Sequence, residues 1–185
     1  MARKYIAFDP KAEVNGYSLL GFSQCLRKEV VQPLLEAHGL ANIDPAGWYP
    51  VQDWLDVLND LAEERPGQAM FDFVAVGMKV AETTQYPPEF KGLPLPKIFT
   101  IGNEQFRSLQ HRGGDVGEIV LEVVGSKHVI QKVRTAYPDD FWYGLFYGFT
   151  RLFLPPGTHF TLYYDPEIPR RDEGGEWTLI HVTWE

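Results

Sequence analysis

The stretch DDFWYGLFYGFTRLFL, residues 139–154, decides the fold. Its aromatic and aliphatic side chains point in every direction around a helix, so this helix must be buried on nearly all sides. Gly144 and Gly148 are four residues apart and share one face, where the missing side chains leave a shallow trough. Asp139 or Asp140 is expected to cap the start of the helix.

Alternating segments flank this helix on both sides. Residues 117–124 alternate apolar and polar side chains, and the turn Gly-Ser-Lys leads into residues 128–137, so the pair is expected to form a β-hairpin. Residues 158–165 and 176–184 alternate in the same way after the helix. Because each adjacent pair of strands has a short connection, the sheet is expected to be antiparallel. The C-terminal half is therefore predicted to be ββαββ.

Helical periodicity fills the part of the chain before the hairpin. Residues 15–38 carry an apolar set that Pro33 is expected to kink or split. Residues 51–62 form one continuous apolar stripe, and residues 67–83 and 96–111 repeat its spacing. These helices must cover one face of the sheet.

The length fits one domain. At 185 residues the chain is expected to form a single α+β unit, in which residues 1–112 make a mainly helical layer. Residues 113–185 then supply a four-stranded antiparallel sheet and the buried aromatic helix. The N-terminal helical layer packs on this sheet.

Charge and cysteine content exclude several classes of partner and location. The formal charge of −8 repels phosphate backbones, so no nucleic-acid partner is expected. Cys25 is the only cysteine, which excludes an internal disulfide and a multi-thiolate zinc site. No segment has the uninterrupted apolar length of a membrane span, and the first residues do not resemble a targeting signal. We therefore expect a cytoplasmic protein.

The glycine trough of the aromatic helix is the candidate site. Either another backbone approaches it, or a flat apolar ligand lies against the glycines between aromatic walls. In the second alternative, the small residues of the 67–83 helix leave unfilled volume opposite the glycines. We therefore expect the cavity between the 67–83 helix and the aromatic helix. If those helices pack without a cavity and no pocket borders either tyrosine, the alternative without a ligand is favoured. The expected ligand contacts are Trp142, Tyr143, Gly144, Phe146, Tyr147 and Gly148.

No residue pattern predicts catalysis or metal binding. The five histidines include no HExxH pair, although His159 and His181 lie on two strands that are expected to pair. Cys25 falls within a helical apolar pattern, where a cysteine behaves as a small hydrophobic residue. Arg170 and Arg171 are interpreted as part of a solvated turn. We assign no catalytic residue and no metal ligand, and we favour a binding module over an enzyme.

The C-terminal half resembles a known group of domains. The order of its elements resembles that of the 4-vinyl reductase domain. This order is a hairpin, the glycine-bearing aromatic helix around residues 143–148, and two strands that close on Gly174 and Gly175 and carry the aromatic Trp177 and Trp184. The arrangement is also similar to the haem nitric-oxide-binding and TRAPP trafficking-subunit families. The resemblance implies an α+β domain that binds a small, largely apolar molecule.

Two departures bear on cofactors. The 4-vinyl reductase pattern carries cysteines around the final glycine turn, whereas residues 170–177 contain none. The haem-binding family needs a proximal histidine on a helix and a tyrosine-serine-arginine contact to the propionates, and no matching string is present. Neither zinc nor haem is supported, so the cofactor is unknown.

The resemblance implies a sensory or carrier module that binds a small hydrophobic ligand. Such a module reports its occupancy to a separate output protein, because this sequence contains no output domain of its own. The alternative is a scaffold or homodimerisation module of the same fold, whose trough is filled by its own core or by a second chain.

Overall fold

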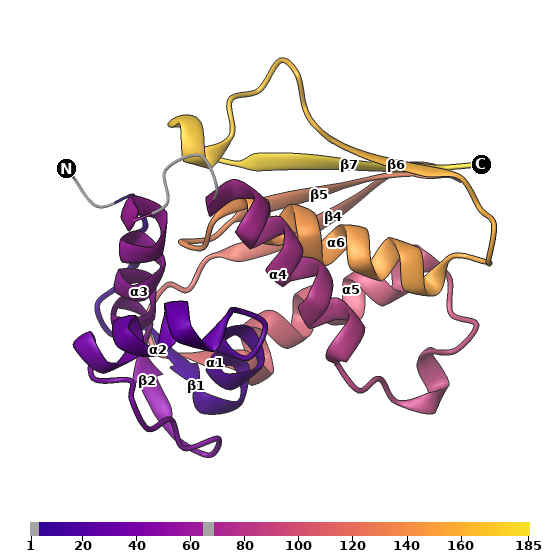
Figure 1. Ribbon diagram of the computed structural model, residues 1–185. Coiled ribbons are helices and arrows are strands. Elements are labelled where there is room, and N and C mark those ends of the chain that lie inside the picture. The colour runs from indigo at the N-terminus through magenta and orange to yellow at the C-terminus, as the bar shows by residue number, and fades with distance from the viewer. Residues whose placement is uncertain (1–3, 65–68) are drawn as a thin grey trace.

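The computed structural model describes residues 4–64 and 69–185. A four-stranded sheet forms one layer, α5 and α6 lie against it with α4 packed on α6, and α1–α3 lie farther from the sheet (Figure 1). The helices are α1 Gly16–Ser23, α2 Lys28–Ala37, α3 Val51–Glu64, α4 Ala69–Thr83, α5 Leu95–Gln105 and α6 Asp139–Phe153. The strands are β1 Glu13–Asn15, β2 Trp48–Pro50, β3 His111–Arg112, β4 Glu118–Gly125, β5 His128–Arg134, β6 Phe160–Tyr164 and β7 Thr178–Trp184.

The large sheet is antiparallel in the order β4-β5-β7-β6. Its strands place one row of side chains on the helical side, where Val129, Ile180 and Val182 are fully buried. This face packs against α5 and α6. The predicted α+β class, the four-stranded antiparallel sheet and the ββαββ order are confirmed.

The helical layer differs from the prediction in two places. The expected helix over residues 15–38 divides at residues 24–27, and Pro33 lies inside α2. The predicted start of the third helix at Gly67 lies outside the described residues. The last expected helix, over 96–111, ends in a wider π-helical turn at Phe106–Gln110.

A second sheet was not predicted. It has three strands in the order β2-β1-β3, and each strand is only two or three residues long. Alternation cannot be recognised over so few residues.

Glycines bring α4 and α6 into backbone contact. A Cβ atom on Gly144 would lie 2.1 Å from the carbonyl oxygen of Val74, and one on Gly77 would lie 2.2 Å from that of Phe141. A Cβ atom on Gly148 would meet the Cβ of Ala81 at 2.5 Å. Only glycine allows this approach, so the predicted trough exists and α4 fills it.

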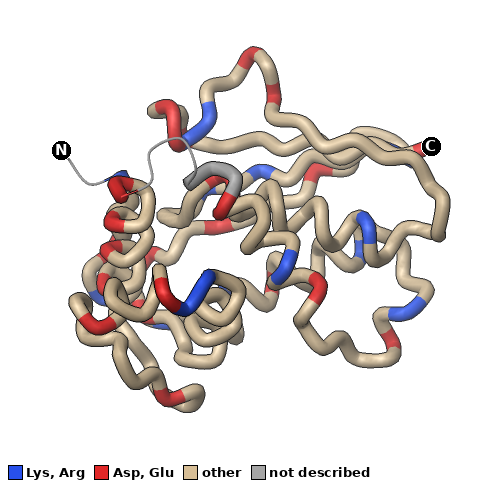
Figure 2. The backbone as a smooth tube through the Cα atoms, viewed as in Figure 1, with Lys and Arg blue, Asp and Glu red and all other residues tan. Residues whose placement is uncertain are grey.

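Charged side chains are spread unevenly over the molecule. Figure 2 shows acidic residues repeating along α3, whereas lysines and arginines are scattered over several elements. Within the described residues, none of the helices has the length and apolar character needed to cross a membrane.

Candidate functional site

A cavity of about 430 Å³ lies where α1, α5 and α6 meet. The segment after α4, from Thr84 to Phe90, closes another side of it. Tyr17 and Leu109 border the cavity and are 71% and 61% exposed, so they mark its mouth. The cavity therefore lies between the helical layer and α6, and it opens to solvent beside α1.

Aromatic rings form most of the inner wall. Phe106 packs edge-on against Trp142 with ring centroids 5.2 Å apart, and Trp142 stacks on Phe146 at 5.9 Å. Phe22 of α1 packs on Trp54 of α3 with ring centroids 5.0 Å apart. All five side chains are buried and border the cavity. Such a wall favours a ligand with a flat or extended apolar body.

The buried His111 and Tyr137 form a neutral polar pair at the cavity. The Nδ1–H group of His111 donates to the carbonyl oxygen of Phe106 at 2.9 Å, and its Nε2 accepts from the Tyr137 hydroxyl at 2.7 Å. Burial lowers the pKa of His111 to about 4 and raises the pKa of Tyr137. Neither group carries charge near neutral pH.

A carboxamide on α5 also reaches the cavity. Asn103 lies on the lining beside Gly102, and its Nδ2 donates to Oε1 of Gln131 on β5 at 2.9 Å. A Cβ atom on Gly102 would meet nothing closer than Phe149, at 4.0 Å, so free space lies in front of this part of α5.

The cavity wall is uncharged. Its described lining residues include no aspartate, glutamate, lysine or arginine. A buried carboxylate or ammonium group would therefore have no partner of opposite charge, which makes its transfer from water costly. The wall suits an uncharged molecule.

The six predicted contact residues fall into three environments. Trp142 and Phe146 line the cavity. Gly144 and Gly148 lie in the contact with α4. The Tyr143 hydroxyl donates to the carbonyl oxygen of Leu162 at 2.8 Å.

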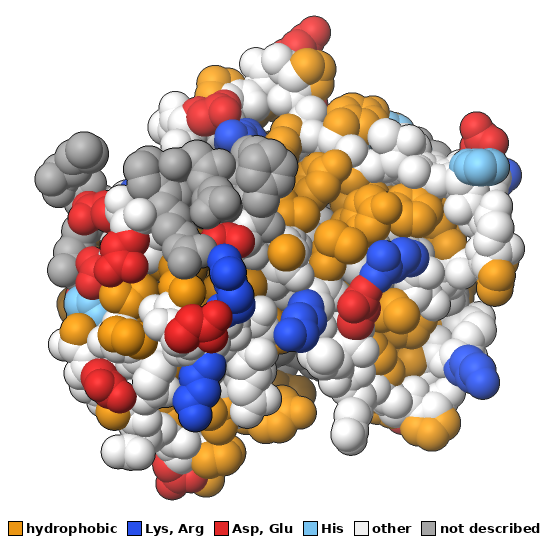
Figure 3. All heavy atoms as spheres, in the orientation of Figure 1, with side chains coloured by type: hydrophobic (Ala, Val, Ile, Leu, Met, Phe, Trp, Pro, Cys, Tyr) orange, Lys and Arg blue, Asp and Glu red, His pale blue; other side chains and the backbone are white. Residues whose placement is uncertain are grey.

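Tyr147, the last of the six, packs on Phe160 of β6 with ring centroids 5.1 Å apart. Figure 3 shows apolar side chains gathered over this region of α6 and β6. Neither Tyr143 nor Tyr147 borders the described cavity. A ligand contact for any of the six residues stays a prediction.

The predicted location of the cavity is wrong. It was expected between the glycine face of α6 and α4, but the two backbones meet there. The cavity lies instead against the face of α6 that carries Trp142 and Phe146. At the glycine trough, α4 and α6 pack without a cavity, which favours the alternative without a ligand at that place. The cavity on the other face of α6 has room for a ligand.

Sequence reasoning missed the α1 and α5 walls of this cavity. A signal was present in α5, where Gly102 and Asn103 interrupt an otherwise apolar face. Both residues have low helix propensity, so their place on a buried face calls for a reason other than helix formation. The π-helical turn that follows is visible only in the structure, and such turns often occur at functional sites.

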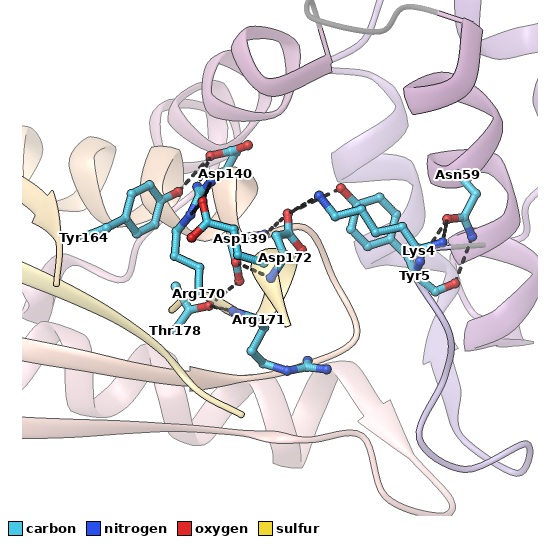
Figure 4. A network of polar contacts seen from close by, with 11 residues as sticks. Lys4, Tyr5, Asn59, Asp139, Asp140, Tyr164, Arg170, Arg171, Asp172 and Thr178 are labelled. Carbon is cyan, nitrogen blue, oxygen red and sulfur yellow. Dashed lines mark hydrogen bonds and ion pairs between the residues drawn. The ribbon is translucent and has the colours of Figure 1, made fainter. Parts of the chain in front are cut away.

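A second polar region lies at the start of α6 (Figure 4). The Asp139 carboxylate accepts from the Thr178 hydroxyl at 2.6 Å and from the backbone N–H of Asp172 at 2.8 Å. The Asp172 carboxylate in turn accepts from the backbone N–H of Asp139 at 3.4 Å and contacts Lys4 Nζ at 3.2 Å. Asp139 and Asp172 thereby hold the start of α6 against the β6–β7 loop.

The same region joins the N-terminal segment to α6. The Tyr5 hydroxyl reaches the Asp172 carboxylate at 3.5 Å, and the backbone N–H of Tyr5 donates to Asn59 of α3 at 2.9 Å. Burial, together with the Asp139 charge, raises the pKa of Asp172 to about 6. Burial also raises the pKa of Asp139. We call Asp139, Asp140 and Asp172 the carboxylate cluster.

Two predictions at this end of α6 are wrong. Asp139 and Asp140 do not cap α6 with their side chains; Asp140 accepts from the Tyr164 hydroxyl at 2.8 Å and from Arg170 at 3.2 Å. Arg170 and Arg171 do not form a solvated turn, because Arg170 lies over the Tyr164 ring and Arg171 donates to the carbonyl oxygen of Thr135. The partners of Asp140 and the partner of Arg171 lie 24 to 36 residues away, so local spacing could not reveal them.

The strands expected to pair do pair, as β6 and β7, but His159 lies just before β6. His181 pairs with His128, whose Nε2 lies 2.9 Å from His181 Nδ1, and not with His159. Asp165 contacts the other ring nitrogen of His181 at 3.0 Å. Over residues 4–64 and 69–185, no group of three or more histidine, cysteine or acidic side chains is arranged to hold a metal ion.

Taken together, these features define an α+β domain with a covered sheet face, a buried aromatic helix and an apolar cavity between that helix and the N-terminal layer. No protein-family profile and no curated protein matches the sequence.

Solved structures of H-NOX domains share this fold. A mutant H-NOX protein from K. algicida, in its unliganded Fe(II) form, is 12% identical, with a TM-score of 0.68 over 92% of this chain and 96% of that chain. A mutant of T. tengcongensis H-NOX is 13% identical, with a TM-score of 0.64 over 92% and 93%. An oxygen-binding H-NOX domain related to soluble guanylate cyclases, solved as its oxygen complex, is 13% identical, with a TM-score of 0.63 over 92% of each chain.

These likenesses establish the fold and support the expected similarity to the haem nitric-oxide-binding family. None of the three structures is a 4-vinyl reductase domain or a TRAPP subunit, so those two resemblances rest on the sequence pattern alone.

The cavity does not fit haem, the group that H-NOX structures are described as holding. His111 is the only histidine among the described lining residues, and both of its ring nitrogens are engaged. That lining includes no cysteine or methionine that could ligate iron, and no lysine or arginine that could neutralise propionates. Whatever molecule the cavity takes must bind without these contacts.

Proposed function

We propose that this chain is a ligand-binding domain of H-NOX fold whose cavity takes a small, uncharged, largely apolar molecule. The observation that carries the proposal is the 430 Å³ cavity itself, which is walled by aromatic rings and lined by no described charged residue. Pockets for small molecules have this size and this mixture of apolar wall with a few polar groups.

The role is that of a sensory or carrier module. As a sensor, the domain would report occupancy to a separate output protein; as a carrier, it would transfer the ligand itself. The position of the cavity supports the sensory role, because a ligand there contacts both α1 of the helical layer and α6 beneath the sheet. Trp142 and Phe146 are the predicted contacts that this proposal retains.

The test is uptake of the uncharged fluorescent dye prodan by the purified 185-residue chain. We expect saturable binding with a blue-shifted emission, since the dye would leave water for an aromatic wall. Gly102→Leu should abolish it, because the leucine side chain would project into the free space in front of α5. Gly125→Leu is the matched control, since Gly125 is exposed and a Cβ atom there meets nothing within 4 Å.

Two outcomes would overturn the proposal. One is the absence of saturable uptake by the wild-type chain, and the other is uptake that Gly102→Leu leaves unchanged. The second would place the dye on another surface.

The alternative is a scaffold or homodimerisation module without a ligand. It is favoured by the glycine trough, which α4 fills as that alternative expects. A stable dimer in light scattering, together with no dye uptake, would support it over ligand binding.

A further inference from the structure

Asn103 and Gln131 form a buried pair of carboxamide side chains. Packing of the surrounding apolar core does not require polar side chains at these two positions. Gln131 lies on the inward face of β5 between Val129 and Val133, and its side chain is fully buried. Its Oε1 accepts from Asn103, while its Nε2 has no hydrogen-bond partner among the described residues. A valine or leucine at this position would avoid that cost, because a buried donor left unpaired is destabilising.

Asn103 is the member of the pair that faces the cavity. Its side chain borders the cavity, and its Nδ2 is engaged with Gln131. Its Oδ1 has no hydrogen-bond donor among the described residues. Gln131 therefore fixes the orientation of Asn103 and leaves a carbonyl oxygen for a ligand to reach.

The other buried polar groups of this wall are already satisfied. His111 and Tyr137 bond to each other, and the indole N–H of Trp142 donates to the Thr135 hydroxyl at 2.7 Å. The hydroxyl of the half-buried Tyr86 donates to the carbonyl oxygen of Ala81 at 2.6 Å. Among these buried groups, Asn103 is thus the one best placed to form a hydrogen bond with a ligand deep in the cavity.

We propose that Asn103, positioned by Gln131, is the specificity-determining residue of the cavity, accepting a hydrogen bond from the hydroxyl or N–H group of an uncharged apolar ligand. This inference rests on the proposed function and names the ligand class: neutral alcohols, phenols or N–H heterocycles with an apolar body. Carboxylates are rejected, because the described wall offers them no cation.

The test is displacement of prodan by three compounds of matched length: decanol, nonyl methyl ether and decanoate. Decanol and the ether have the same number of heavy atoms, but only decanol donates a hydrogen bond. At about pH 7 we expect decanol to bind about tenfold more tightly than the ether, the effect of one buried hydrogen bond, and decanoate to bind most weakly.

Variants separate recognition from packing. Asn103→Leu keeps the shape of the side chain and should bring decanol to the affinity of the ether while leaving the ether unchanged. Gln131→Leu should reduce the preference for decanol in part, because Asn103 would keep its carbonyl oxygen but lose its support. If Asn103→Leu fails to fold, equal affinities of decanol and the ether for the wild-type chain still overturn the proposal, and the preference measured in Gln131→Leu still tests whether Asn103 causes it.

The outcomes distinguish this inference from the proposed function. Equal affinity of decanol and the ether, with both displacing prodan, would overturn the role of Asn103 and leave the binding function standing. A decanol preference that survives Asn103→Leu would also overturn it. No prodan binding at all would overturn the proposed function first.

Discussion

The cavity and the carboxylate cluster both contain buried polar side chains, but the two regions differ in charge and in how their polar groups are paired. At the cavity, His111 and Tyr137 are held neutral, and no described lining residue is charged. At the start of α6, the carboxylate cluster keeps acidic groups buried and meets them with Lys4, Arg170, a threonine hydroxyl and backbone N–H groups. The cluster is saturated by the protein itself, whereas the cavity keeps Asn103 available.

The difference separates a region whose acidic groups are paired within the protein from one that keeps an unpaired acceptor beside a cavity. A satisfied network holds segments together, here the N-terminal segment, α6 and the β6–β7 loop. A cavity with an available acceptor and an apolar wall offers the same chemistry to a ligand. Each region should therefore respond to substitution and to pH in its own way.

The largest expected effect is loss of stability in Asp139→Ala. The substitution leaves the Thr178 hydroxyl and the Asp172 N–H without their acceptor in a buried site. We expect the free energy of unfolding to fall by about 3 kcal/mol. Urea denaturation measures it, with Glu173→Ala as a control that should change little because Glu173 is exposed. A loss below about 1 kcal/mol would show that the cluster does not hold α6 in place.

The second effect is a pH dependence set by His111. Burial lowers its pKa from 6.5 to about 4, so the unfolded chain binds the proton more tightly than the folded chain. The stability that His111 contributes is present above about pH 6.5 and is lost as the pH falls toward 4, by about 3 kcal/mol in total. We expect His111→Phe to remove this loss, measured by urea denaturation from pH 7.5 to pH 4.5. Parallel curves for the two proteins would contradict a neutral, buried His111.

The third effect has the opposite sign and belongs to the carboxylate cluster. Burial raises the pKa of Asp172 from 3.8 to about 6, so the folded chain binds the proton more tightly. The stability that this group contributes is present below about pH 4 and is lost as the pH rises through 6, by about 3 kcal/mol. From pH 4 to pH 7, the free energy of unfolding of the wild type should therefore fall relative to that of Asp172→Asn, as measured by urea denaturation. A difference that does not vary with pH would show that Asp172 titrates normally.

The smallest expected effect is on stability in Gly102→Leu. Leucine has a higher helix propensity than glycine, and its side chain meets open space at this site, so the variant should be as stable as wild type or up to about 1 kcal/mol more stable. Thermal unfolding measures the change. A marked destabilisation would mean that the space in front of α5 is already filled.

Local patterns predicted much of the fold. The stripe of α3, the hairpin β4–β5 and the all-round apolar character of α6 are properties of neighbouring residues, so spacing revealed them. The close approach at Gly144 and Gly148 was also foreseen as one of two alternatives, since missing side chains on one helix face require a partner.

The site was harder to predict, because it depends on which elements meet. Trp142 and Phe146 were identified from α6 alone, but Asn103 and His111 join them only through the tertiary fold. The partners of Asp139 lie at Asp172 and Thr178, more than 30 residues away, so capping was the natural but incorrect interpretation. Strands of two or three residues gave no pattern at all.

The most direct test of the cavity as a ligand site is mapping of amide chemical shifts during titration of the isotope-labelled protein with prodan. The account predicts that shifts concentrate on α1, α5 and the cavity face of α6, at residues such as Ser18, Gly102 and Phe146. The carboxylate cluster and the solvent face of the sheet should stay unchanged. Shifts confined to that sheet face, or no saturable shifts, would contradict the cavity as the site of binding.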